Sequence, residues 1–355
     1  MFLNKFFTKL KAVFSDDLGI DLGTMNTLVC QADKGIVLDE PSVVACYVEN
    51  GRVFKVGGEA KKLLGRTPPN IKVYRPVKNG VIADSTVTDK MLAYFIKSAR
   101  GYFKVMQPRV VVGVPYGITT VEAEAVRNSA HKAGAREVRL VAEPYAAAVG
   151  AGMPILDPTG NMVVDIGGGT TEVAMISVGA IETAESIQYG GDKMDEAIML
   201  YMQKEHNLSI GERAAEDIKK KIGMACVTDK PDEMEVRGLE LGMHGSSLPR
   251  SVIINSNEIQ QALEGPVLQI LSCVRRTIDS TQPGLAADLI QNGITLTGGG
   301  SLLRGLDYRL EQETGLPVRV AQDALKAVVN GTGELLKMPD MIFSFPEDRI
   351  FGCPN

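Results

Sequence analysis

The chain has 355 residues, of which 45% are hydrophobic and 23% charged, so it is long enough to form two lobes with large apolar cores and lacks the composition of a disordered protein. Its formal net charge of −5 argues against a broad nucleic-acid-binding surface, and we expect no nucleic-acid partner. The five cysteines form no CxxC pair, which favours free thiols in a reducing cytosol. The three histidines lack zinc-ligand spacing, and there is no GxSxG hydrolase elbow.

The first fourteen residues predict an amphipathic helix. Wound at about 100° per residue, residues 1–14 gather their large apolar side chains in one arc and leave the lysines on the opposite side. A helix about 20 Å long and interrupted by lysines cannot span a bilayer, so it would lie in the membrane interface. The same pattern also suits a helix docked on its own domain. A signal peptide is disfavoured because Asp16 and Asp17 follow. The apolar and basic residues 101–106 are a second candidate membrane contact, or a segment tucked under the neighbouring helix.

The strongest functional signal is a strand followed by a glycine turn that occurs twice, over residues 19–24 and 163–170. In each copy an apolar run leads to an aspartate, Asp21 or Asp165, and then to glycines that let backbone N–H groups approach phosphate oxygens. A single such turn would equally suit a tight hairpin, but the recurrence favours two lobes that face one nucleotide. Mg²⁺ on a nucleotide needs only one or two nearby carboxylates, which these aspartates would supply.

A third glycine turn, over residues 294–301, again follows an apolar strand and precedes a helix-like stretch at 302–313, whose N-terminus would suit an anion. Neither a GxxxxGK[ST] P-loop nor a GxGxxG turn opening a βαβ unit is present, so the phosphate site is built differently.

Local patterns predict several further elements. Thr119 or Thr120 is expected to cap a helix that ends near Gly134, and Glu143 with Pro144 to open another. Glu216 and Lys219 share one face of a predicted helix, which suits either binding of a ribose or base edge or a solvated i,i+3 salt bridge. The other expected elements are strands at 27–30, 35–38, 110–114, 138–141, 171–178 and 234–237 and helices at 86–98 and 212–223.

Together these motifs resemble the MreB branch of the actin-like ATPase superfamily over residues 17–337. The resemblance rests on the turns above and on the stretches 40–45, 65–68, 80–84, 141–144, 165–174 and 296–300. It implies an α/β actin-like, ribonuclease H-like duplicated fold with two lobes and four subdomains. The implied parts are a membrane helix at 1–14, lobe I at 15–157 plus 325–345 with an insert near 42–84, lobe II at 158–324 with an insert near 192–254, and a tail at 346–355.

The resemblance also implies a site for ATP and Mg²⁺. Asp21 and Asp165 would hold Mg²⁺ through water, and Glu143 with Thr170 would position the water that attacks the γ-phosphate. Met25 stands where most members of the family carry alanine. The implied nucleotide-binding residues are Thr24, Met25, Asn26, Gly167, Gly168, Gly169, Thr170, Glu216, Asp217, Ile218, Lys219, Gly298, Gly299, Gly300 and Ser301.

The function implied is that of a bacterial actin homologue, an ATPase that polymerises with itself into filaments and organises cell-wall synthesis to determine cell shape. It would act at the inner face of the cytoplasmic membrane, held by residues 1–14 and 101–106, with membrane proteins of the cell-wall elongation machinery as partners. The alternative is a small-molecule kinase of the same superfamily, although no acceptor-binding signature is present. An Hsp70-type chaperone would need a peptide-binding domain after the ATPase, and a plasmid-segregating actin is disfavoured by the quoted stretches.

Overall fold

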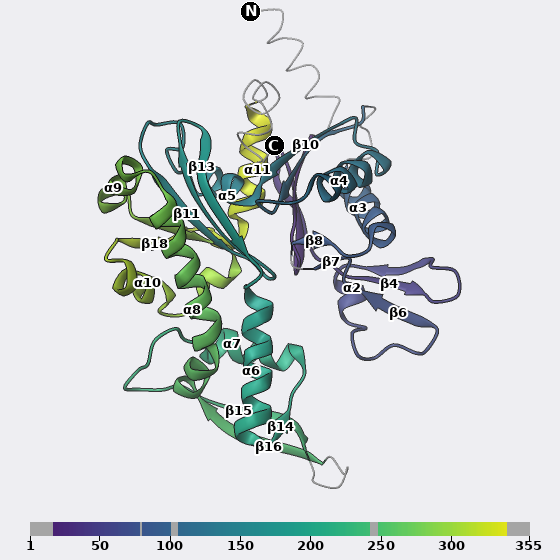
Figure 1. Cartoon of the computed structure of the whole chain (residues 1–355). Coiled ribbons are helices and arrows are strands. Elements are labelled where there is room, and N and C mark those ends of the chain that lie inside the picture. Colours follow the sequence, from purple (N-terminus) through teal and green to yellow (C-terminus); the bar gives the residue numbers. More distant parts are fainter. Residues whose placement is uncertain (1–16, 79, 101–105, 242–247, 339–355) are drawn as a thin grey trace, which may run out of the picture.

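The computed structural model describes residues 17–78, 80–100, 106–241 and 248–338. The predicted 1–14 helix, the 346–355 tail and nearly all of the 101–106 segment lie outside these ranges. The described chain forms two α/β lobes side by side, each extended by a smaller insert (Figure 1). Within the described ranges, no helix combines the length and the apolar character needed to cross a membrane.

The lobe I sheet has five strands in the order β10-β9-β1-β2-β3, in which β1, β9 and β10 pair in parallel and β2 pairs antiparallel with both β1 and β3. Helices α3 (Ser85–Ala99) and α4 (Thr120–Lys132) cover one face through a shared apolar core. As predicted, Thr119 caps α4, and Glu122 completes a reciprocal capping box. The strands are β1 (Leu18–Leu22), β2 (Asn26–Gln31), β3 (Gly35–Pro41), β9 (Arg109–Val114) and β10 (Glu137–Ala142).

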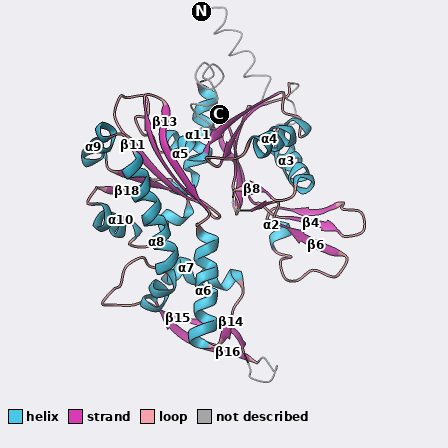
Figure 2. Ribbon diagram, in the orientation of Figure 1, coloured by secondary structure: helices cyan, strands magenta, loops and turns pink. Residues whose placement is uncertain are grey.

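The lobe II sheet repeats this plan in the order β13-β12-β11-β17-β18, so the duplication expected from the two turns is confirmed. Helices α8, α9 and α10 lie on its outer side (Figure 2). The elements are β11 (Asn161–Ile166), β12 (Thr171–Ser177), β13 (Ala180–Ile187), β17 (Ile294–Thr297), β18 (Val318–Val320), α8 (Ser256–Ser280), α9 (Pro283–Asn292), α10 (Leu306–Thr314), and the 3₁₀ turns η1 (Gly299–Leu302) and η2 (Ala324–Lys326).

Helices α5 (Glu143–Gly150) and α11 (Ala327–Lys337) lie between the two sheets. Their apolar side chains join Val111 of the first sheet and Val163 of the second in one core cluster. The helices cross closely, because a Cβ added to Gly331 would lie only 1.8 Å from the carbonyl oxygen of Ala146. This crossing connects the lobes and holds the N-terminus of α5, where Glu143 lies, between them.

Each lobe carries an insert at one end of its sheet (Figure 1). These inserts flank the cleft between the lobes. The lobe I insert contains β4 (Val44–Tyr47), β5 (Val53–Val56), α2 (Gly58–Lys61), β6 (Ile71–Tyr74), β7 (Val77–Lys78) and β8 (Val81–Ile82), and the lobe II insert contains α6 (Gly191–His206), β14 (Leu208–Ser209), α7 (Glu212–Ile222), β15 (Glu233–Glu240) and β16 (Pro249–Asn255).

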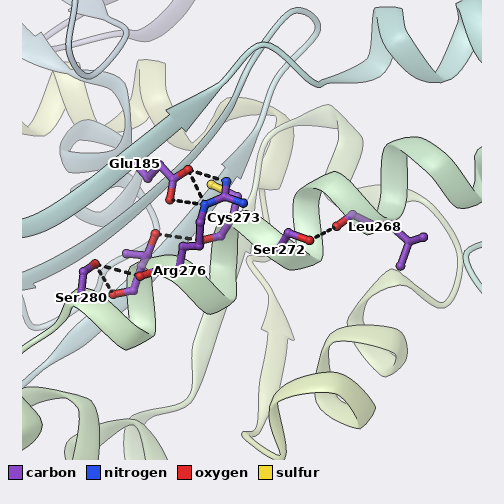
Figure 3. Close-up of polar contacts among 7 residues, drawn as sticks. Glu185, Leu268, Ser272, Cys273, Arg276 and Ser280 are labelled. Atoms are coloured by element: carbon purple, nitrogen blue, oxygen red, sulfur yellow. Dashed lines mark hydrogen bonds and ion pairs between the residues drawn. The ribbon is translucent and has the colours of Figure 1, made fainter.

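Helix α8 is fastened to the edge strand of the lobe II sheet. Arg276 on α8 donates from Nε to both carboxylate oxygens of Glu185 on β13, at 2.9 and 3.1 Å (Figure 3). Cys273, one turn earlier, is fully buried beneath this pair, and burial raises the pKa of its thiol to about 12. The thiol is therefore a core group rather than a reactive one.

One expected element begins at the wrong place. The helix predicted over 302–313 is instead α10, which begins at Leu306. Gly305 immediately before it is in the left-handed region, with φ +75°, and interrupts any continuous helix from the third glycine turn. The glycines themselves form the 3₁₀ turn η1. The N-terminus of α10 is therefore separated from the glycine turn that it was expected to follow directly.

Candidate functional site

The three glycine turns meet at a cleft of about 630 Å³ between the lobes. Its lining comes from both lobes and both inserts. The predicted site residues that line it are Asp21, Met25, Asn26, Glu143, Asp165, Gly167, Gly168, Glu216, Lys219, Gly298, Gly299 and Gly300. The chain therefore brings residues from distant parts of the sequence to one cavity.

The first two turns touch each other across the cleft. A Cβ added to Gly168 would lie 2.4 Å from Cγ of Met25, so only a glycine fits there without displacing the Met25 side chain. Thr24 beside Met25 is buried, and its Oγ1 accepts a hydrogen bond from the Gly80 N–H at 3.1 Å. Thr24 thus ties the first turn to the lobe I insert.

The third turn lies directly on the end of β11. Gly298 has φ +78°, and a Cβ on it would lie 2.4 Å from the carbonyl oxygen of Ile166. Ser301 does not line the cleft, because its buried hydroxyl donates to the carbonyl of Gly298 at 2.7 Å. Its role is to close the turn, whereas the expectation had placed it against the nucleotide.

Asp21 and Asp165 end equivalent strands, β1 and β11, and both carboxyls face the cleft. Burial, with repulsion from Asp165 and Asp39, raises the pKa of Asp21 to about 7. Burial also raises the pKa of Asp165 to about 6, against the lowering effect of the Thr297 hydroxyl, which donates to Oδ1 at 2.9 Å. Facing carboxyls with such raised pKa values suit a nearby divalent cation, whose charge would offset their repulsion.

Glu143 opens α5, where Pro144 fits the first turn of the helix because it lacks an N–H to satisfy. Its carboxyl lines the cleft but is largely shielded from solvent, being only 9% exposed. Burial raises the pKa of Glu143 well above its usual range, and repulsion from Glu172, Asp21 and Asp165 raises it further. Among the described contacts no hydrogen bond restrains this carboxyl, which leaves its oxygens available to a water molecule.

Thr170, expected to act beside Glu143, is buried outside the cleft lining. Its methyl group packs near Gly80, and its carbonyl accepts the Gly167 N–H at 2.9 Å. Gly169 beside it is also buried and outside the lining. These contacts shape the second turn.

Helix α7 presents only part of the expected set to the cleft. Its apolar face is spaced at helical periodicity, so Ile218 lies with Ala215 and Ile222 in the lobe II core and outside the cleft lining, where the nucleotide had been expected to contact it. Asp217 is exposed and also lies outside the lining. Glu216 and Lys219 do reach the cleft.

The alternative of a salt bridge between Glu216 and Lys219 is also corrected. Glu216 pairs instead with Lys220 at 2.5 Å, whereas Lys219 pairs with Asp195 at 2.9 Å. Lys219 Nζ also donates to the carbonyl of Gly191 at 2.8 Å, at the start of α6. Burial outweighs this ion pair and raises the pKa of Asp195 to about 6. Asp195 lines the cleft and was not anticipated from sequence.

Glu172 on β12 is another group that sequence reasoning missed. It is 1% exposed, and burial raises its pKa well above the usual range. The sequence signal that could have revealed it is a carboxylate within an otherwise mostly apolar predicted strand. In the structure all seven residues of that strand are buried. Among the described residues, no cluster of three or more His, Cys, Asp and Glu side chains could by itself hold a metal ion.

Comparison with known proteins identifies relatives along nearly the whole chain. A family model described as MreB/Mbl protein matches residues 15–344. The chain is 50% identical over 338 residues to the cell shape-determining protein MreB of Escherichia coli (strain K12), covering 94% of this chain and 96% of that protein. It is 46% identical over 332 residues to the cell shape-determining protein Mbl of Bacillus subtilis (strain 168), covering 93% and 98%.

Solved structures of related proteins have the same fold along nearly the whole chain. The crystal structure of MreB 5 of Spiroplasma citri bound to AMPPNP superposes with a TM-score of 0.87 at 33% identity, covering 93% of this chain and 98% of that chain. A MamK double helical filament superposes with a TM-score of 0.75 at 22% identity, covering 90% and 98%, and shows likeness of fold. The fold is therefore actin-like, and the relatives support a cell shape-determining actin homologue over a small-molecule kinase. The chain belongs to the MreB/Mbl family.

Proposed function

We propose that this chain binds ATP with Mg²⁺ in the cleft between its lobes and hydrolyses it. The observation that carries the proposal is the meeting of three glycine turns with Asp21, Asp165 and Glu143 at one cavity. A related protein of known structure, MreB 5 of Spiroplasma citri, has been captured with AMPPNP and with ADP. Backbone N–H groups of the turns would hold the phosphates, and Leu302, Leu325 and Val328 would offer apolar contact to the base.

In this proposal the buried carboxyls have separate tasks. Asp21 and Asp165 would hold Mg²⁺ through water, and the bound ion would neutralise phosphate charge and polarise the γ-phosphate. Glu143 would orient the attacking water from the N-terminus of α5, with Thr170 stabilising the turn beside it. Hydrolysis gains mainly from orientation and charge stabilisation, so a carboxylate held between the two lobes suits the role.

Replacing Glu143 by glutamine tests this assignment. Glu143→Gln keeps the size of the side chain but removes the acid, so we expect phosphate release to slow at least about a hundredfold. ATP affinity, measured by titration with a fluorescent ATP analogue, should stay within about twofold. Glu124→Gln, on the exposed face of α4, is the matched control and should hydrolyse ATP like the unmodified chain. Equal loss of affinity and turnover would count against a catalytic role for Glu143.

The proposal extends to filaments held at the inner face of the cell membrane, where they would organise cell-wall synthesis together with membrane proteins of the elongation machinery. Family membership supports this, and the apolar arc of residues 1–14 supports the membrane contact. Electron microscopy of the purified chain on an anionic lipid monolayer should show filaments with Mg-ATP. Replacing both Phe6 and Phe7 by Glu should release them from the lipid. Dispersed monomers at all protein concentrations would contradict self-assembly, and unchanged lipid binding by the variant would contradict the anchor.

A further inference from the structure

A polar row crosses the lobe II sheet behind the candidate water-orienting residue. In the strand register Glu172 on β12 lies opposite Asp165 on β11 and Ser186 on β13, and Asp165 lies opposite Thr297 on β17. Residues opposite one another in a sheet project from the same face. That face is the one that packs on α5, because Ala174 and Ile176 farther along β12 belong to the α5 core. The row therefore lies on the face of the sheet that packs on α5.

Of the two carboxyls in this row, only that of Glu172 belongs to a residue outside the cleft lining. Asp165 lines the cleft, whereas Glu172 is buried behind the lining. The pKa of Glu143 is raised first by burial and then by repulsion from neighbouring carboxylates. Of these carboxylates, Glu172 has the largest effect. Glu172 lies on the face of β12 that packs on α5, close enough for its carboxyl to repel that of Glu143 at the start of this helix.

The duplicated fold shows that a carboxylate is not needed here for folding. In lobe I the residue opposite Asp21 is Leu28, just as Glu172 is opposite Asp165 in lobe II. Leu28 is 6% exposed, so an apolar residue satisfies the equivalent position. Burying a carboxyl beside other carboxyls costs free energy, which indicates that Glu172 is retained for a task other than packing.

The contacts of Glu172 span the two lobes. Its Oε2 accepts a hydrogen bond from the backbone N–H of Tyr116 at 3.2 Å, and Tyr116 belongs to the lobe I connection between β9 and α4. Its Oε1 accepts a weaker bond from the Ser186 hydroxyl at 3.4 Å, within lobe II. A change in the closure of the lobes would therefore move Glu172 relative to one of these partners.

We infer that Glu172 is a positioning residue for ATP hydrolysis, which aligns Glu143 when its carboxyl joins β12 of lobe II to the Tyr116 amide of lobe I. The inference rests on the proposed role of Glu143. Because Glu172 lies outside the cleft lining, it would act only through its neighbour Glu143. It makes hydrolysis depend on how the two lobes are docked.

Two substitutions separate this role from a structural one. Glu172→Leu copies Leu28 and removes both acceptor oxygens, whereas Glu172→Gln keeps one oxygen for the Tyr116 N–H. We expect Glu172→Leu to lower kcat for phosphate release about tenfold or more without changing ATP affinity, and Glu172→Gln to recover most of that loss. Glu182→Leu makes the same change at an exposed position of β13 and should leave kcat unchanged.

Combining the variants distinguishes failure of the inference from failure of the proposed function. In a Glu143→Gln background, Glu172→Leu should cause no further loss, because the residue through which it acts is already removed. Independent, multiplying losses would overturn the inference, as would normal turnover by Glu172→Leu while Glu143→Gln is inactive. Normal turnover by Glu143→Gln would instead overturn the role proposed for Glu143, and this inference with it. The melting temperature of Glu172→Leu should not fall, and a fall that accompanies weaker ATP binding would show that Glu172 is structural.

Discussion

At Gly168 and Met25 the two lobes meet through single residues of their glycine turns. The glycine is required by this contact rather than by its backbone angles, since a Cβ would come within 2.4 Å of Met25 Cγ. Arg75 lies over the same methionine, with Nη1 3.8 Å from the sulfur. The Met25 side chain therefore fills the space that Gly168 leaves open, and the pair sets how closely the phosphate-binding turns approach.

This contact predicts a compensating pair of substitutions. Gly168→Ala should push the two turns apart and weaken ATP binding about tenfold, since overpacking typically costs about 1–3 kcal/mol. Met25→Ala removes the obstructing atom, so the double variant should regain much of the lost affinity. Calorimetric titration with a non-hydrolysable ATP analogue measures all four proteins as a double-mutant cycle. A double variant no better than Gly168→Ala alone would show that the contact with Met25 is not the cause.

At the scale of elements, the sequence was informative wherever the signal is local. Thr119 and Glu122 stand three residues apart and form the capping box of α4, and Glu143 with Pro144 begins α5 as predicted. The start of the helix after the third glycine turn was predicted too early. The sequence shows a glycine at position 305, but it does not show that this glycine takes the left-handed conformation that precedes α10.

Contacts between elements were less accessible to sequence reasoning. A salt bridge between Glu216 and Lys219 was one of two alternatives offered by their spacing, but Lys219 pairs with Asp195 on α6 because α6 and α7 pack together. Glu172 was passed over because its neighbours come from the β9–α4 connection, from α5 and from β13, and their proximity depends on strand register and on the docking of two lobes. The meeting of the glycine turns at one cleft was predictable from their recurrence, whereas the second layer of carboxyls behind them required the assembled fold.

At the scale of the whole molecule, an ion pair joins the two inserts on opposite sides of the cleft. Arg75 follows β6 in the lobe I insert, and its Nη2 donates to Oε2 of Glu212, at the start of α7 in the lobe II insert, at 2.8 Å. The pair is partly exposed, with side-chain exposures of 31% and 67%. Such surface pairs are worth at most about 1 kcal/mol, so this tie would retard opening of the cleft without locking it.

Loss of the ion pair between Arg75 and Glu212 should change the dissociation rate of the bound nucleotide. We expect Glu212→Ala to raise the dissociation rate of a fluorescent ATP analogue about two- to fivefold at low salt, because a tie worth up to about 1 kcal/mol is lost, and to differ less at high salt, where the pair is screened. Arg75→Glu and Glu212→Arg should each accelerate release, and combining them should restore slow release by reversing the pair. Stopped-flow displacement with excess ATP measures these rates. If the reversed pair released nucleotide as fast as either single variant, Arg75 and Glu212 would be neighbours that do not hold the lobes together, and the Met25 and Glu172 contacts would have to account for cleft closure.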